Sequence, residues 1–214
     1  MSKSSTPVDD DLFAFIAAAT IPEDPLLLDL RLAAAKAGLP EIHIAPEQAA
    51  FLQLLLRATR ARTVIEVGTL GGYSAIAMAR GLPADGRVIT HEIDARHATF
   101  ARDWIERSDQ RSKIEVRVGN AADTLRAVPA GSADAMFLDA DKAGYVTYLQ
   151  HSLRILRPGG ILLADNVLAS GEVARGTGET AVAIRAFLAA VAATTSLRSV
   201  IVPLGDGCLF GVKQ

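Results

Sequence analysis

From residue 63 onward, short runs of β-branched and other apolar residues alternate with amphipathic stretches. This alternation constrains the fold more than any other feature, because it is typical of strands that alternate with helices. The first, fourth and fifth runs are almost entirely apolar, as expected of strands covered by helices on both faces. The pattern therefore predicts an α/β fold with a parallel sheet, whose strands lie at 63–67, 87–92, 113–118, 135–139 and 160–165.

Both ends of the chain extend this prediction. Apolar residues recur at helical spacing over 9–59, with two breaks that contain proline or glycine, so we expect three N-terminal helices. A last helix over about 178–194 precedes two more strand-like runs, 196–203 and 207–212. The connection Gly205-Asp206-Gly207 suits a hairpin. We therefore expect the sheet to end in an antiparallel pair.

Composition limits the class of protein. The chain has 214 residues, of which 50% are hydrophobic, so residues 1–214 are predicted to form a single domain, with the helices of 1–60 covering part of its ligand site. A net charge of -2 gives no basic field that would attract nucleic acid or an anionic membrane surface. The apolar stretch 12–19 is too short for a membrane span and lacks a basic leader. We expect a cytoplasmic protein with a small-molecule partner.

A glycine-rich turn follows the first predicted strand, at the position where open α/β sheets bind ligands. Its sequence, EVGTLGGYS over 66–74, has G-x-x-G-G spacing, whereas a dinucleotide site has G-x-G-x-x-G. The flanking Glu66 suits a ligand that carries an ammonium or sulfonium group, and Glu92, at the end of the second strand, can accept hydrogen bonds from ribose hydroxyls. Ala121 follows the third strand, where it either meets an adenine edge or belongs to an ordinary turn. By itself the glycine turn has a second interpretation, a tight entry into a helix, which Glu66 and Glu92 together make weaker.

Acidic and amide side chains follow the fourth and fifth predicted strands. Asp139, Asp165 and Asn166 offer hard oxygen ligands, which suit Mg²⁺, with Ca²⁺ and Mn²⁺ as alternatives, and not Zn²⁺. Three protein ligands leave coordination positions for water and for a substrate with adjacent hydroxyls. Lys142 is then placed to accept the proton of a metal-bound phenol, although a lysine after a strand is ordinarily a solvated charge. Asp141 could simply cap a helix.

Several segments, taken in this order, resemble the cation-dependent small-molecule O-methyltransferases, the caffeoyl-CoA and catechol O-methyltransferase group with its bacterial relatives. The similarity runs from about residue 42 to the C-terminus and includes IAPEQ (44–48), EVGTLGGYSAIAMA (66–79), HEID (91–94), FLDADKAGY (137–145), RPGGILLADNVL (157–168) and PLGDG (203–207). The resemblance implies a Rossmann-like class I methyltransferase fold with seven strands, the last one reversed, and a homodimer. Plant relatives carry an aromatic residue shortly after the Asp-Asn pair, where this chain has Ala169-Ser170-Gly171.

The resemblance also implies roles for individual residues. Lys142 and Asp139 are the predicted catalytic residues, and Asp139, Asp165 and Asn166 the predicted metal ligands. The predicted S-adenosylmethionine site consists of Ile44, Glu66, Gly68, Thr69, Gly72, Ser74, Glu92, Ile93, Ala121 and Asp139.

The predicted activity is methyl transfer from S-adenosylmethionine to a hydroxyl of a small phenolic, catechol-like acceptor. A non-catalytic S-adenosylmethionine-binding protein is one alternative, although sensing alone would not require Lys142 and the acidic cluster. A nicotinamide-dependent oxidoreductase is a weaker alternative, because the glycine spacing and Glu66 oppose it.

Overall fold

The predicted strands form one mixed sheet in the computed structural model, which describes residues 6–19 and 22–214. Within the described residues the sheet has seven strands, in the order β3-β2-β1-β4-β5-β7-β6. The strands are β1 (Thr63–Val67), β2 (Arg87–Glu92), β3 (Ile114–Val118), β4 (Ala133–Leu138), β5 (Leu156–Ala164), β6 (Leu197–Val202) and β7 (Cys208–Lys213). Strands β1 to β5 are parallel, and β7 runs antiparallel to both β5 and β6. Seven strands with a reversed last strand are what the family resemblance implied.

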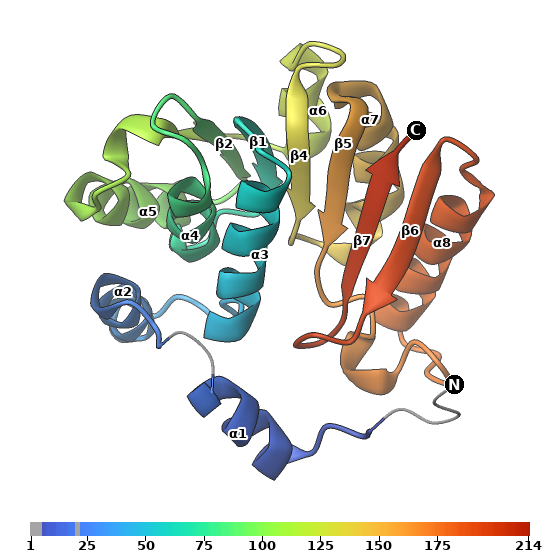
Figure 1. The fold of residues 1–214 in the computed structure, drawn as a ribbon, viewed down its shortest axis with the longest axis horizontal. Helices are drawn as coiled ribbons and strands as arrows, with labels where there is room; N and C mark the ends of the chain where they lie inside the picture. Colours follow the sequence, from blue (N-terminus) through green and yellow to red (C-terminus); the bar gives the residue numbers. More distant parts are fainter. Residues whose placement is uncertain (1–5, 20–21) are drawn as a thin grey trace.

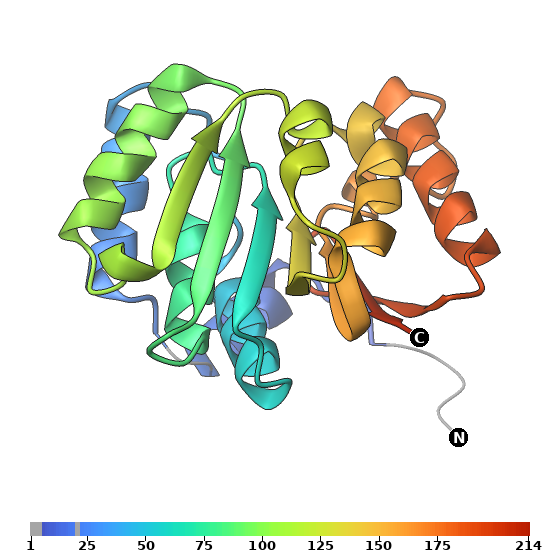
Figure 2. The ribbon, with the colours of Figure 1, turned by 90° about the horizontal axis from the view of Figure 1, so that it is seen from above.

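Helices cover both faces of this sheet (Figure 1 and Figure 2). The helices of the described residues are α1 (Asp10–Ala19), α2 (Pro25–Lys36), α3 (Pro46–Ala58), α4 (Tyr73–Gly81), α5 (Ala95–Arg107), α6 (Ala121–Thr124), α7 (Tyr145–Ile155) and α8 (Glu179–Ala193). Helices α2 to α5 pack on one face, and α6 to α8 pack on the other. The alternation of side chains along a strand divides the core in two: in β4, Phe137 belongs to the first cluster and Met136 to the second.

The three expected N-terminal helices are present, and their starts follow from the local sequence. Asp24 accepts a hydrogen bond from the backbone N–H of Leu27 and caps α2, which begins at Pro25. Pro46 begins α3 in the same way. Helix α1 lies away from the sheet in Figure 1, and none of its described residues is buried. None of the described helices combines the length and apolar character that a membrane crossing requires.

The predicted starts of the third, fourth and fifth strands were wrong by one, two and four residues. The third strand begins at Ile114 because Arg111–Lys113 forms a short 3₁₀ turn. The fifth strand begins at Leu156 and includes Pro158, and its pairing with β4 shifts between Ala133 and Ala135. A proline cannot donate a hydrogen bond to the sheet ladder, and such residues are found at irregular positions of this kind. The strand tips that face the ligand site were predicted to within one residue.

The strand order places a switch point between β1 and β4, because the chain moves outward to β3 and then returns to the other side of β1. Ligands bind at such a point, outside the carboxyl ends of the strands. The backbone N–H of Asp139 donates to the carbonyl of Val67, and that of Asp165 donates to the carbonyl of Leu138. The residues that follow β1, β4 and β5 are thereby held side by side.

Candidate active site

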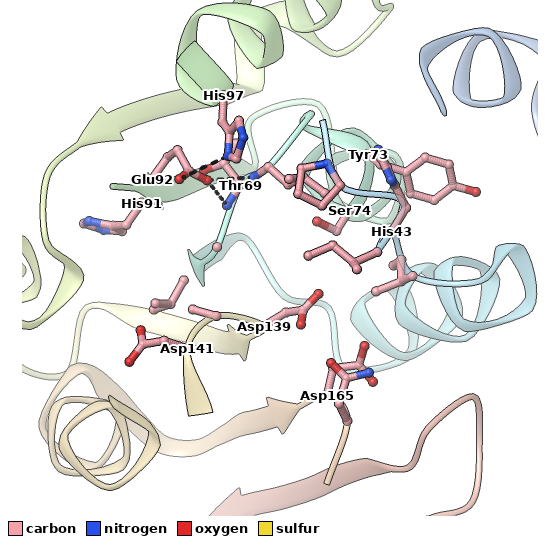
Figure 3. Close-up of a pocket in the computed structure, with 18 of the residues that line it drawn as sticks. His43, Thr69, Tyr73, Ser74, His91, Glu92, His97, Asp139, Asp141 and Asp165 are labelled. Atoms are coloured by element: carbon pink, nitrogen blue, oxygen red, sulfur yellow. Dashed lines mark hydrogen bonds and ion pairs between the residues drawn. The ribbon is translucent and has the colours of Figure 1, made fainter. Parts of the chain in front are cut away.

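A cavity of about 1030 Å³ opens at this switch point. Eleven of the predicted site residues line it: Ile44, Gly68, Thr69, Ser74, Glu92, Ile93, Ala121, Asp139, Lys142, Asp165 and Asn166. The other two, Glu66 and Gly72, lie outside its wall. The structure therefore brings the two halves of the predicted site, the glycine turn and the acidic cluster, into one space (Figure 3).

The glycine turn approaches the neighbouring strand closely. Gly68 has φ +101°, and a Cβ atom at this position would overlap the backbone carbonyl oxygen of Asp139. Only glycine satisfies both constraints. Gly72 is the N-terminal cap of α4 and lies next to Ala101, so its position in the structure is that of a packing residue at the start of the helix.

Glu66 is fully buried behind the wall of the cavity. Ser74, which does line the cavity, donates a short hydrogen bond to Glu66 Oε1, while Glu66 Oε2 has no hydrogen-bond partner among the described residues. Burial raises the pKa of Glu66 to about 8, and the hydrogen bond from Ser74 opposes this shift. A buried carboxyl with an unpartnered oxygen beside the cavity fits a cationic group of a ligand.

Glu92 is held by backbone groups on two sides. Its Oε2 atom accepts hydrogen bonds from the N–H groups of Thr69 at 3.2 Å and Leu70 at 2.8 Å, and its Oε1 atom accepts one from Asp94 at 2.9 Å. The carboxylate therefore fixes the glycine turn in addition to facing the cavity. Sequence reasoning gave Glu92 a ligand role and missed this structural role.

Lys142 lies at the centre of the acidic cluster. Its Nζ atom donates to Tyr145 Oη at 2.6 Å and to Asn166 Oδ1 at 3.0 Å, and it lies 3.5 Å from Asp139 Oδ1. It also lies 4.6 Å from the centre of the Tyr145 ring. Tyr145 is fully buried, and its hydroxyl is within 3.1 Å of the carbonyl oxygens of both Leu138 and Asp165. The tyrosine thus fixes the lysine amine between the tips of β4 and β5.

The two acids of the cluster face the same part of the cavity (Figure 3). Burial and the nearby charge of Asp165 raise the pKa of Asp139 to about 6, and burial also raises the pKa of Asp165. Two buried carboxyls, one of which is disfavoured by the charge of the other, fit a shared cation. Asp141 also borders the cavity, but its carboxylate accepts from the Gly144 N–H at 2.8 Å and from Tyr148 Oη at 2.6 Å, so it caps the turn, as one interpretation of the sequence had it.

The donor set for a metal is small. Among residues 6–19 and 22–214, no group of three or more His, Cys, Asp and Glu side chains could hold an ion. A cation would therefore rest on the carboxylates of Asp139 and Asp165 and the amide oxygen of Asn166, with other ligands from water or substrate. Asn166 has φ +56°, a conformation that asparagine tolerates better than most residues. The oxygen-only set fits a hard divalent ion.

Several cavity residues were missed by sequence reasoning. His91 is buried, its Nδ1 atom lies 2.7 Å from Thr124 Oγ1, and burial lowers its pKa to about 4, so its ring is neutral. Gln48, from the first turns of α3, reaches Asp165. Helical periodicity predicts that one face of α3 is buried, but it does not indicate which polar residue reaches the end of a distant strand. The loop after Asn166 contributes Ser170 to the cavity, and the turn between β6 and β7 contributes Gly205.

Comparison with known proteins agrees with this fold and site. The O-methyltransferase family model matches residues 17–214. The chain is 42% identical over 197 residues to a catechol O-methyltransferase of Niastella koreensis, covering 90% of this chain and 87% of that one. It is 39% identical over 173 residues to a catechol O-methyltransferase of Mycobacterium tuberculosis, covering 81% and 79%. The crystal structure of an O-methyltransferase from Bacillus cereus in complex with S-adenosylhomocysteine (SAH) superposes with a TM-score of 0.88 at 36% identity, covering 94% of this chain and 96% of that one.

The sheet order and the glycine turn are those of a class I methyltransferase. The family model and the relatives identify the group of these enzymes as the O-methyltransferases. This chain belongs to the O-methyltransferase family.

Proposed function

We propose that this protein transfers the methyl group of S-adenosylmethionine to a hydroxyl of a small catechol-like acceptor, with the help of a divalent cation. One observation carries the proposal: Asp139, Lys142, Asp165 and Asn166 meet at the tips of two neighbouring strands, in the same cavity as the glycine turn. The relatives named catechol O-methyltransferase and the Bacillus cereus enzyme that binds SAH support the donor and the acceptor class.

The donor would lie along the glycine turn. Gly68 and Thr69 allow close approach to the backbone, and the Glu66–Ser74 pair would face the ammonium group of the methionine moiety. Glu92 would accept hydrogen bonds from the ribose, since it lies at the end of β2 and borders the cavity. Ile44, from the segment before α3, would close over the bound cofactor.

The acceptor would lie between the donor and Lys142. A divalent cation held by Asp139, Asp165 and Asn166 would lower the pKa of a coordinated phenol, which is otherwise about 10. Lys142 Nζ, which Tyr145 and Asn166 hold in place, would accept the phenolic proton. The acceptor oxygen then forms a bond to the methyl carbon while the carbon–sulfur bond breaks, and the products are a methyl ether and SAH. Binding both reactants in line can supply about 7–11 kcal/mol of barrier reduction.

A methyl-transfer assay tests the proposal. Purified protein is incubated with S-adenosylmethionine and catechol, with Mg²⁺ or with a chelator, and both SAH and methylated catechol are quantified by mass spectrometry. We expect the two products in equal amounts with Mg²⁺, and a loss of both with the chelator or in Asp165→Ala. Cofactor binding without either product would favour the sensor alternative, and full activity of Asp165→Ala under chelation would refute the metal role.

A further inference from the structure

A buried hydrogen bond joins α3 to the tip of β5 across 117 residues of sequence. Gln48 Nε2 donates to Asp165 Oδ1 at 2.6 Å, and the two residues are 2% and 3% exposed. A carboxylate oxygen accepts hydrogen bonds and does not donate them, so the amide nitrogen of Gln48 must face it. The contact therefore holds Asp165 from a helix that is remote in sequence from the strand that precedes this residue.

The group that donates this hydrogen bond is a neutral amide, and its lack of charge matters as much as its position. An amide fixes a carboxylate without neutralising it, whereas a lysine or arginine here would compete with a bound cation for the same charge. The hydrogen bond from Gln48 is made to Oδ1 alone, so it does not occupy the second carboxylate oxygen of Asp165. Such outer contacts orient the ligands of metal sites.

The other atom of the Gln48 amide faces the loop between β6 and β7. A Cβ atom at Gly205 would lie 3.0 Å from Gln48 Oε1, tighter than ordinary van der Waals contact. Gly205 also has φ +56°, which strains any other residue except asparagine or aspartate. Gln48 is therefore held between Asp165 on one side and the glycine of this loop on the other.

We propose that Gln48 is a positioning residue for the cation site: it holds Asp165 in the rotamer that binds the metal, and Gly205 provides the space that Gln48 needs. This inference rests on the proposed function, because it assumes that Asp165 is a metal ligand. It predicts that a change at Gln48 weakens metal binding while the fold and cofactor binding are kept.

The first test compares Gln48→Met with wild type. Methionine keeps the length of the side chain but cannot donate a hydrogen bond, and Gln53→Met is the matched control in the same helix. Mn²⁺ binding is measured by electron paramagnetic resonance, SAH binding by calorimetry without metal, and the unfolding temperature by circular dichroism. We expect Gln48→Met to raise the Mn²⁺ dissociation constant about 10–100-fold, with SAH affinity within about twofold of wild type.

The second test changes Gly205, which lies beside the Oε1 atom of Gln48. Gly205→Ala should weaken Mn²⁺ binding in the wild-type background, because the new methyl group displaces the amide of Gln48. In Gln48→Ala, which has no amide to displace, the same change should cost less Mn²⁺ affinity than in wild type, and the remaining loss reports the strain of alanine at φ +56°. Non-additivity of this kind identifies coupling between the two positions.

The outcomes separate the two proposals. If wild type binds Mn²⁺ and folded Gln48→Met binds it equally well, or if Gln53→Met loses as much, the role of Gln48 is refuted and the metal site stands. Additive effects of Gly205→Ala and Gln48→Ala would refute the role of Gly205. If wild type itself binds no Mn²⁺, the metal part of the proposed function fails, and the role of Gln48 fails with it.

Discussion

The buried carboxyl of Glu66 should make the protein less stable as pH rises. Its pKa is about 8 in the folded protein against an ordinary value of 4.5, so the folded state binds the proton more tightly than the unfolded state does. The stability that protonated Glu66 contributes is complete below the unfolded pKa and is lost as pH rises toward the folded pKa. At about 1.36 kcal/mol per pKa unit, the loss between about pH 5 and pH 9 amounts to about 4 kcal/mol.

Glu66→Gln isolates this contribution. Glutamine keeps the shape and can still accept the hydrogen bond from Ser74, but it cannot ionise. Urea unfolding of wild type and variant, without cofactor or metal, gives the free energy of unfolding at each pH. The other titrating groups are common to both proteins, so the difference between the two curves reports Glu66. Between pH 5 and pH 9, the free energy of unfolding of the variant should rise by about 4 kcal/mol relative to that of wild type. If the two curves run parallel, the reasoning is refuted.

Four further predictions follow from the site. Lys142→Met should reduce the turnover of catechol methylation about 10²–10⁴-fold while SAH affinity by calorimetry stays unchanged, as expected for loss of a general base. Gly68→Ala should lower the free energy of unfolding by about 3 kcal/mol or more, because its Cβ would overlap Asp139. Gly178→Ala meets no atom within 4 Å and should lower it by only about 1 kcal/mol, the cost of replacing the N-cap of α8. Among the described residues that line the cavity, Lys142 is the only lysine or arginine, and six residues are acidic. This excess of negative charge favours cationic acceptors, so a catechol with a cationic side chain should have a higher kcat/KM than an anionic coenzyme A thioester. Sedimentation velocity should give a homodimer, as the family resemblance implies.

The sequence was sufficient for the sheet and for the strand tips that carry the site. β-branched runs at regular spacing predicted the strands, and the rule that ligands bind at carboxyl ends predicted that Gly68, Asp139 and Asp165 lie close together. Both inferences use local pattern and general topology. The number of strands followed from the family resemblance, and the antiparallel end of the sheet from the Gly205-Asp206-Gly207 hairpin signal and the resemblance together; the strand order came from the structure.

Contacts between distant side chains could not be predicted in this way. The hydrogen bond from Gln48 to Asp165 depends on how α3 packs against the sheet, which no local pattern encodes. The position of Glu66 behind the cavity wall, in contrast, follows from the alternation of side chains along β1. Its neighbours Ile65 and Val67 belong to the second core cluster and Val64 to the first, so the period of two along β1 places Glu66 on the side of α4.

The central claim is that Asp139 and Asp165 bind one cation beside the cofactor. The most direct test is a crystal grown with SAH and Mn²⁺, with diffraction data collected at the manganese absorption edge. The account predicts a single anomalous peak bounded by the side-chain oxygens of Asp139, Asp165 and Asn166. A cavity with SAH bound and no peak between these residues, or a peak elsewhere in the molecule alone, would contradict it.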